Sequence, residues 1–128
     1  MNIEVIKSKI HQLGVFALID FKLGDIIETC PIIVLPKKDR ELIDKTTLYN
    51  YYFDWRGEVS ISLGYGSLYN QSYKPNARYI KDYQNNCINF VAIKKIKKGQ
   101  EITVNYNGSP RSKKKLWFIP NTESTDKA

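Results

Sequence analysis

Three short segments of this 128-residue chain combine residue types that could bind a polar ligand or support a reaction. The first is Leu13–Gly14–Val15–Phe16–Ala17, in which a glycine enters an apolar, strand-like stretch. Glycine at such a position lets a ligand approach the backbone where a Cβ would block it. An ordinary turn glycine would give the same pattern, so this segment alone decides nothing.

The second and third segments carry amides and a tyrosine. Residues 66–79 (GSLYNQSYKPNARY) place the polar run Asn70–Gln71–Ser72 among aromatic residues and ahead of Pro75–Asn76, which offers amide groups beside apolar rings. Residues 99–108 (GQEITVNYNG) indicate a strand that leads to Tyr106. Taken separately, a surface loop and a half-buried packing tyrosine explain these two segments equally well.

The composition indicates a single globular domain. The chain is long enough for one core and too short for two, and 42% of its residues are hydrophobic. It has no apolar run of the roughly 20 residues needed to span a bilayer, and no signal-peptide core, so we expect no membrane partner. We expect an intracellular, cytoplasmic location, with a nuclear or chromatin-associated one as the alternative in a eukaryotic host. Cys30, Cys87 and His11 are too few for a four-ligand zinc site, so we expect reduced thiols and no metal.

The net charge of +7 comes partly from two basic runs, at residues 94–98 and 111–115. Such runs are often only solvated surface, but they also suit nucleic acid or an acidic partner. Because nine tyrosines accompany this charge, a small basic nucleic-acid-binding module that stacks bases is one interpretation of the chain.

The elements that must position these residues are mostly β. Val59–Leu63 alternates apolar and polar residues, which predicts a strand with one buried face. We predict a short helix at Asp39–Lys45 with Asp39 as its N-cap, and no definite element for residues 46–55. The other predicted strands are Val15–Ile19, Asp25–Thr29, Ile32–Leu35, Arg78–Lys81, Ile88–Ile93 and Glu101–Asn105.

The three segments, in this order and at these distances, resemble the SET-domain family. Gln12–Leu13–Gly14 is similar to a Gly-x-Gly motif, and Asn70–Gln71–Ser72 with Pro75–Asn76 is similar to an Asn-His-Ser run followed by Pro-Asn. The third motif is Gly-x-Glu-(Leu/Ile)-Thr before a tyrosine, matched by the segment from Gly99 to Tyr106. The resemblance is closest to the short, free-standing SET proteins of viruses and bacteria.

Three positions depart from these motifs. Gln12 replaces a glycine, Gln71 the usual histidine, and Asn105 an aspartate often found before the tyrosine. The departures at Gln71 and Asn105 support an alternative interpretation, a SET-fold protein that binds a peptide or cofactor without catalysis.

The resemblance implies a mostly β, β-clip-like SET fold with a C-terminal pseudoknot, as a single domain over residues 1–120 with a flexible tail at 121–128. It implies a protein-lysine N-methyltransferase that uses S-adenosylmethionine, with histones among the candidate substrates. The implied catalytic residue is Tyr106, and the implied lysine channel is lined by Tyr79, Val104 and Tyr106. The implied cofactor-binding residues are Leu13, Gly14, Val15, Phe16, Tyr69, Asn70, Gln71, Tyr106 and Trp117, with Phe118 beside the last.

The implied reaction is an in-line displacement at a sulfonium methyl group by a neutral lysine amine. The free lysine pKa of about 10.4 falls when the amine is desolvated beside a cation, so no strong protein base is required. Tyr106 would align the amine. Val104 leaves room for further methyl groups, but Tyr79 could hold a water in that space, which favours monomethyllysine. We expect a protein or peptide partner with an accessible lysine, weak nucleic-acid contact through the basic runs, and a monomer or homodimer.

Overall fold

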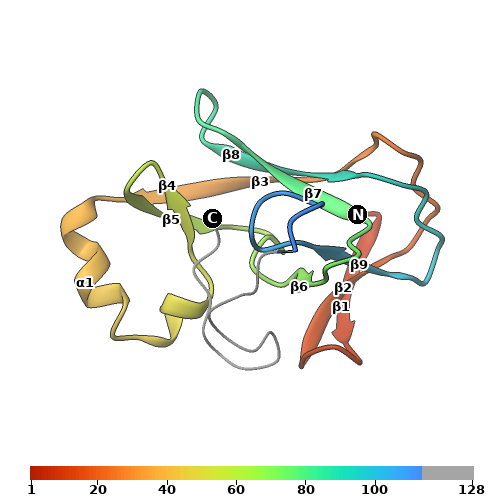
Figure 1. The fold of residues 1–128 in the computed structure, drawn as a ribbon, viewed down its shortest axis with the longest axis horizontal. Helices are drawn as coiled ribbons and strands as arrows, with labels where there is room; N and C mark the ends of the chain where they lie inside the picture. Colours follow the sequence, from red (N-terminus) through yellow and green to blue (C-terminus); the bar gives the residue numbers. More distant parts are fainter. Residues whose placement is uncertain (114–128) are drawn as a thin grey trace.

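The computed structural model describes residues 1–113, which form two small sheets (Figure 1). The first sheet has the strand order β1-β2-β9-β6. Its members are β1 (Ile3–Lys7), β2 (Leu13–Ala17), β9 (Glu101–Val104) and the two-residue β6 (Asn70–Gln71). The pairings β1–β2 and β2–β9 are antiparallel, whereas β6 runs parallel to β9. The predicted strand Val15–Ile19 therefore lies two residues too late, and β1 is an additional strand.

The second sheet has the order β4-β5-β3-β8-β7 and is antiparallel throughout the described residues. The central strand, β3, covers both predicted strands of this region and continues through Pro31. Before Pro31 it pairs with β8, and beyond it with β5, so the proline lies where the partner changes. The bounds are β3 (Ile26–Leu35), β4 (Phe53–Trp55), β5 (Glu58–Ser62), β7 (Ala77–Asp82) and β8 (Cys87–Ala92).

Helical structure is confined, among residues 1–113, to the segment between β3 and β4, at the left of Figure 1. It comprises η1 (Lys37–Asp39), α1 (Arg40–Ile43) and η2 (Thr47–Asn50). The predicted helix at 39–45 is present but shorter. Asp39 occupies the N-cap position, yet its side chain makes no capping hydrogen bond, because its backbone is already helical.

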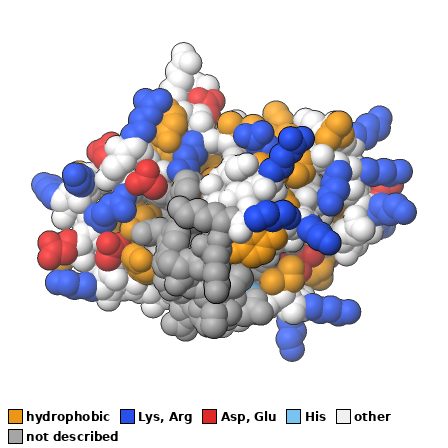
Figure 2. Space-filling model, in the orientation of Figure 1, with side chains coloured by type: hydrophobic (Ala, Val, Ile, Leu, Met, Phe, Trp, Pro, Cys, Tyr) orange, Lys and Arg blue, Asp and Glu red, His pale blue; other side chains and the backbone are white. Residues whose placement is uncertain are grey.

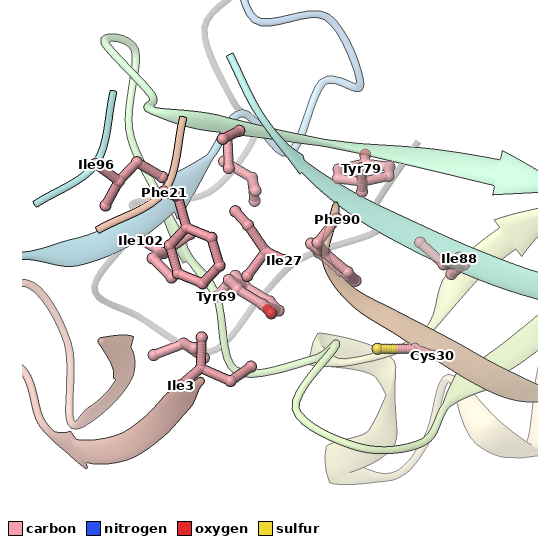
Figure 3. Packing of buried hydrophobic residues seen from close by; sticks show 14 of the residues in the cluster. Ile3, Phe21, Ile27, Cys30, Tyr69, Tyr79, Ile88, Phe90, Ile96 and Ile102 are labelled. Carbon is pink, nitrogen blue, oxygen red and sulfur yellow. The ribbon is translucent and has the colours of Figure 1, made fainter. Parts of the chain in front are cut away.

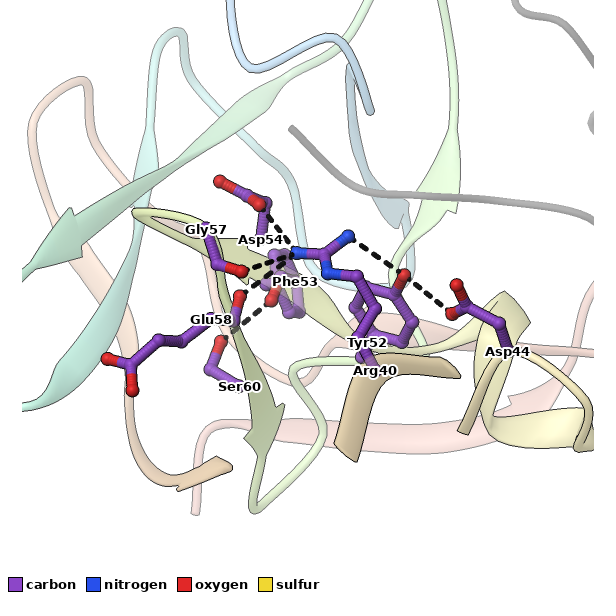
Figure 4. A network of polar contacts seen from close by, with 8 residues as sticks. All are labelled: Arg40, Asp44, Tyr52, Phe53, Asp54, Gly57, Glu58 and Ser60. Atoms are coloured by element: carbon purple, nitrogen blue, oxygen red, sulfur yellow. Dashed lines mark hydrogen bonds and ion pairs between the residues drawn. The ribbon is translucent and has the colours of Figure 1, made fainter. Parts of the chain in front are cut away.

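Arg40 fastens this helical segment to the β4–β5 hairpin (Figure 4). Its Nη2 forms a 2.8 Å ion pair with Asp54 and donates to the Glu58 carbonyl at 3.1 Å. Its Nη1 donates to the Tyr52 hydroxyl at 3.2 Å, and that hydroxyl donates to Asp44 at 2.8 Å. The segment is thus held by a polar network around one guanidinium group, although no side chain of η1, α1 or η2 is buried.

The hydrophobic core fills the space between the two sheets (Figure 3). Tyr69 and Phe90 stack there with ring centroids 4.1 Å apart. An isolated bridge between Phe21 and Ile96, with backbone hydrogen bonds of 2.8 and 3.0 Å, closes one side of the core. Many short strands around one apolar centre confirm the mostly β fold.

Some predictions fall outside the described part of the chain. The domain boundary at residue 120, the tail at 121–128, and the aromatic pair Trp117–Phe118 all lie beyond residue 113. Within residues 1–113, no helix is long and apolar enough to cross a bilayer. The same residues contain no group of three or more His, Cys, Asp or Glu side chains placed to hold a metal ion.

Candidate active site

Tyr106 lies two residues beyond β9, against the segment that contains β6. The parallel register pairs Asn70 with Thr103 and Gln71 with Val104, which brings the second and third motifs together. The Tyr106 backbone N–H donates to Oε1 of Gln71 at 2.5 Å. Its hydroxyl donates to the Tyr69 carbonyl at 2.8 Å. Residues 69–71 therefore hold Tyr106 at both its backbone and its hydroxyl.

Tyr79, on β7, completes a pair of buried phenols. Its hydroxyl donates to the Tyr106 carbonyl at 2.9 Å, and its ring meets Phe53 edge-on, with centroids 5.1 Å apart. Burial raises the pKa of Tyr79, and the neighbouring Tyr106 raises it further. Burial also raises the pKa of Tyr106, with smaller contributions from Tyr51 and Glu101. Both hydroxyls stay protonated near neutral pH, so they can donate and accept hydrogen bonds but cannot act as bases.

Tyr69 anchors the same segment in the core. Its hydroxyl donates to Oε1 of Glu28 at 2.7 Å, and the other carboxylate oxygen accepts from the Tyr65 N–H at 3.0 Å. Burial raises the pKa of Tyr69, and the Glu28 carboxylate raises it further. Because the ring is fully buried, the Tyr69 side chain fixes the backbone carbonyl that receives Tyr106.

Asn70 joins all three motifs through one amide group. Its Nδ2 lies 3.0 Å from the Leu13 carbonyl and 2.8 Å from Oε2 of Glu101. The Ser8 hydroxyl and the His11 carbonyl lie within 3.3 Å of the same nitrogen. Ser8 also donates to the other oxygen of Glu101 at 2.7 Å. Asn70 and Glu101 thus tie the loop before β2 to β9.

Gly14 is required by this cluster. A Cβ at this position would lie 2.9 Å from Cδ of Glu101 and 3.0 Å from Nδ2 of Asn70, and nearer still to a carboxylate oxygen. The backbone of β2 can approach the two polar side chains only because residue 14 has no side chain. Close packing against Glu101 and Asn70 therefore explains the glycine of the first motif, whether or not a ligand also approaches the backbone there.

Gln71 leaves a buried donor without a partner. Its side chain is 5% exposed, and its Oε1 accepts from Tyr106. Its Nε2 has no hydrogen-bond partner among the described residues. An unsatisfied buried N–H is costly, so this atom is suited to an acceptor supplied by a bound molecule.

Asn105 stabilises the turn that follows β9. It is 2% exposed, its Nδ2 donates to the Ser112 carbonyl at 2.8 Å, and its Oδ1 accepts from the Asn107 N–H at 3.0 Å. An aspartate could accept the second bond but could not donate the first. In this chain the departure from the motif therefore has a structural use.

Asn76, of the Pro-Asn pair, also binds β9. Its Nδ2 donates to the Glu101 carbonyl, and its Oδ1 accepts from the Thr103 N–H, at 2.8 and 2.9 Å. The Asn76 amide thus forms hydrogen bonds with the β9 backbone of the kind that a neighbouring strand would form. Its role within the described structure is to fix β9 beside the start of β7.

The predicted site residues fall into three sets. Leu13, Gly14, Tyr69, Asn70, Gln71, Tyr79, Val104 and Tyr106 lie together around the β6–β9 pair. Val15 lies in the core opposite Ile102, so only its backbone could face a ligand, and Phe16 is half-buried opposite Glu101. Trp117 lies outside the described residues.

Sequence reasoning gave no role to Glu101, Ser8 or Glu28. Glu101 lies inside the third motif, and that position could have indicated a role in the site. Ser8 and Glu28 had no motif around them, and their partners lie 93 and 41 residues away along the chain.

The comparisons with known proteins agree with this geometry. The SET domain family matches residues 12–107. A histone-lysine N-methyltransferase of Schizosaccharomyces pombe, specific for H3 lysine-37, is 29% identical over 99% of this chain and 88% of its own length. The structure of a candidate histone methyltransferase of Plasmodium falciparum is 33% identical, covers 84% of this chain and 95% of its own, and gives a TM-score of 0.67.

A more distant structure shows the same fold. A humanised mutant of the Chaetomium thermophilum Polycomb Repressive Complex 2, bound to an inhibitor, gives a TM-score of 0.70 at 18% identity. That match covers 81% of this chain and 14% of the other. Fold and site together define a SET-domain protein. The chain belongs to the SET domain family and, with it, to the protein-lysine methyltransferases.

Proposed function

We propose that this protein transfers a methyl group from S-adenosylmethionine to a histone lysine, with Tyr106 as the catalytic tyrosine. The observation that carries the proposal is a pair of buried phenols: residues 69–71 hold Tyr106 at its backbone and hydroxyl, and the Tyr79 hydroxyl donates to the Tyr106 carbonyl. Hydroxyls that are held in place in this way can position a reactant, and because they stay protonated they do not act as bases.

The residues around β6 fit the cofactor. Gln71 Nε2 is a buried donor that lacks a partner among residues 1–113, and S-adenosylmethionine offers carboxylate and adenine acceptors. Leu13, Gly14 and Asn70 would contact the cofactor from the side of the loop before β2. The backbone of Val15, the ring of Phe16, and Tyr69 would also contact it. Trp117 would cover the adenine. The bound cofactor supplies an electrophilic methyl group on a sulfonium.

The lysine would react as a neutral amine in a channel formed by Tyr79, Val104 and Tyr106. Val104 is buried and apolar, so the channel wall would disfavour the ammonium form. The Tyr106 hydroxyl would orient the amine lone pair toward the methyl group. The raised pKa of Tyr106 keeps its hydroxyl protonated, so this group cannot take up the proton lost by lysine. That proton would pass to solvent.

The substrate class rests on the relatives. The S. pombe enzyme named above acts on H3 lysine-37, and it aligns with nearly the whole of this chain. A histone substrate would place the protein where histones are made or bound, in the cytoplasm or nucleus. We propose a monomer or homodimer with a histone tail as its protein partner, and with weak nucleic-acid contact through the basic runs.

Incubation with labelled S-adenosylmethionine and recombinant core histones, including H3, tests the proposal, with Tyr106→Phe as the matched variant. The variant keeps the ring but removes the hydroxyl, so turnover should fall by well over tenfold. The unfolding free energy should fall by about 1–3 kcal/mol, because the Tyr69 carbonyl loses its donor. Unchanged turnover by a folded Tyr106→Phe protein would refute the catalytic assignment. Absence of methylation of any histone would refute the substrate class.

A further inference from the structure

A strongly basic pocket of about 740 Å³ lies next to the candidate active site. Three separate segments form it, at residues 73–78, 93–94 and 109–113. Half of its ten lining residues are cationic: Lys74, Arg78, Lys94, Arg111 and Lys113. None of the lining residues is acidic, and Tyr73, Pro75 and Ile93 supply apolar surface between the charges. The fold therefore gathers positive charge that is scattered along the sequence.

No carboxylate neutralises these cations within residues 1–113. The ion pair of the described structure joins Arg40 to Asp54, in the network that anchors α1. Lys113 donates to the Tyr73 carbonyl at 3.0 Å, which fixes the position of the ammonium group but does not neutralise its charge. Figure 2 shows mainly blue side chains on the right half of its face, around apolar surface and with few red ones. Five like charges in one concavity repel one another, so an anionic ligand would stabilise the arrangement.

We infer that this pocket binds the phosphate backbone of a nucleic acid. Double-stranded DNA carries one charge for roughly each 1.7 Å of its axis, whereas successive carboxylates of an acidic peptide are at least about 3.3 Å apart. A pocket with five cations matches the denser anion better. Arg78 and Arg111 present planar guanidinium groups that can bind phosphate oxygens in pairs.

The segments that line the pocket are close in sequence to those of the candidate active site. Tyr73 and Lys74 follow directly after the Asn70–Ser72 motif, and residues 109–113 begin three positions after Tyr106. The biological source of the nucleic acid rests on the proposed function, since histones wrap DNA through phosphate contacts. Binding to the pocket itself does not depend on catalysis.

Fluorescence anisotropy with a mixed-sequence 20-base-pair DNA duplex, over a range of salt concentrations, tests the inference. The test variant is Lys74→Gln/Arg78→Gln/Lys94→Gln. The control, Lys37→Gln/Lys38→Gln/Lys45→Gln, removes the same charge from exposed positions around α1. The plot of log affinity against log salt should lose about 0.9 in slope for each phosphate contact removed. We therefore expect a slope shallower by two to three in the test variant and little changed in the control.

Equal losses of slope in both triple variants would overturn the inference, because they would mean diffuse attraction by net charge. So would polyglutamate that binds as tightly as the duplex at equal charge concentration, or a duplex that does not bind at all. Methylation of a histone H3 peptide, measured in parallel without DNA, tests the proposed function separately. Absence of methylation with intact, pocket-dependent DNA binding would refute the activity and support the pocket.

Discussion

At the scale of single residues, the site depends on amides that each satisfy backbone groups of another segment. Asn70 reaches the loop before β2, Asn76 binds β9, and Asn105 holds the turn after β9. Gln71 binds the Tyr106 backbone. Side-chain amides can bind the backbone of another segment in this way because each carries both a donor and an acceptor. Gln71 and Asn105, the two departures that favour an inactive SET protein, therefore both have structural partners.

Tyr79→Phe should shift the product from monomethyllysine toward di- and trimethyllysine. The Tyr79 hydroxyl donates to the Tyr106 carbonyl, and a phenol that donates one hydrogen bond can still accept another from water. Removing the hydroxyl would release such a water and make space for an additional methyl group. Mass spectrometry of a lysine peptide at full conversion decides this, and abundant trimethyllysine from the unmodified protein would contradict it. Phe53→Leu, which alters the ring neighbour but keeps the hydroxyl, is the control.

Asn105→Asp should destabilise this protein, although aspartate is frequent at this position in the family. The change removes the donor to the Ser112 carbonyl and places a carboxylate against that carbonyl in a buried site. We expect a loss of about 1–3 kcal/mol in the free energy of unfolding, measured by urea denaturation. Asn2→Asp, at an exposed position, is the matched control and should leave stability nearly unchanged. A stable Asn105→Asp protein would show that the amide donor is dispensable.

At the scale of elements, the parallel contact between β6 and β9 organises the site, although β6 is only two residues long. Such a strand contributes little stability of its own. Its position is fixed by Tyr69 in the core on one side and by Asn70 on the other. Short elements of this kind follow from long-range contacts and not from local propensity.

Gly14→Ala should weaken both the fold and cofactor binding, because the added methyl group would collide with Glu101 and Asn70. Overpacking of this kind costs about 1–3 kcal/mol of unfolding free energy. In a Glu101→Ala background the colliding carboxylate is absent, so the penalty of Gly14→Ala should shrink. Urea denaturation of the four proteins of this double-mutant cycle measures the difference. Additive penalties would place the role of Gly14 elsewhere than in this contact.

The sequence predicted elements wherever periodicity was local. A strand is present at the predicted Val59–Leu63, as β5, but its predicted buried face was wrong: Ser60 and Ser62 are buried, whereas Leu63 is exposed. The segments 78–81 and 88–93 match β7 and β8 within a residue or two. Residues 46–55 stayed unassigned because η2 and β4 divide an aromatic run that has no period of its own. The strand break predicted around Pro31 was wrong, because a change of partner strand accommodates the proline.

The site itself could be predicted only through the order of its motifs. Nothing in the types of Asn70 and Tyr106 says that residues separated by 36 positions meet. The resemblance supplied that contact, and the β6–β9 pairing confirms that the segments lie side by side. The Glu101–Ser8 and Tyr69–Glu28 bonds were missed because long-range polar pairs leave no periodic pattern in a single sequence.

At the scale of the whole molecule, the core contains several protonated hydroxyls, so the fold should be sensitive to alkali. Burial raises the pKa values of Tyr69, Tyr79 and Tyr106, and burial beside Glu28 raises that of the Cys30 thiol to about 12. Between the ordinary tyrosine pKa of about 10 and these raised values, the unfolded chain loses protons that the folded protein keeps. The contribution of Cys30 is therefore fully present only below about pH 9, and that of the tyrosines below about pH 10, and both are lost as the pH rises further.

The slope of unfolding free energy against pH should steepen above pH 10 by about 1.4 kcal/mol per unit for each of the three tyrosines. Lys81 acts in the opposite direction, since burial lowers its pKa, so the test compares variants and does not use the total slope. Relative to the unmodified protein, Tyr79→Phe should remove the contribution of one tyrosine and make the slope above pH 10 shallower by about 1.4 kcal/mol per unit. Urea denaturation between pH 8 and 11 gives both slopes. Equal slopes for the Tyr79→Phe and unmodified proteins would show that Tyr79 ionises as readily in the folded protein as in the unfolded chain, which its burial and its bond to Tyr106 argue against.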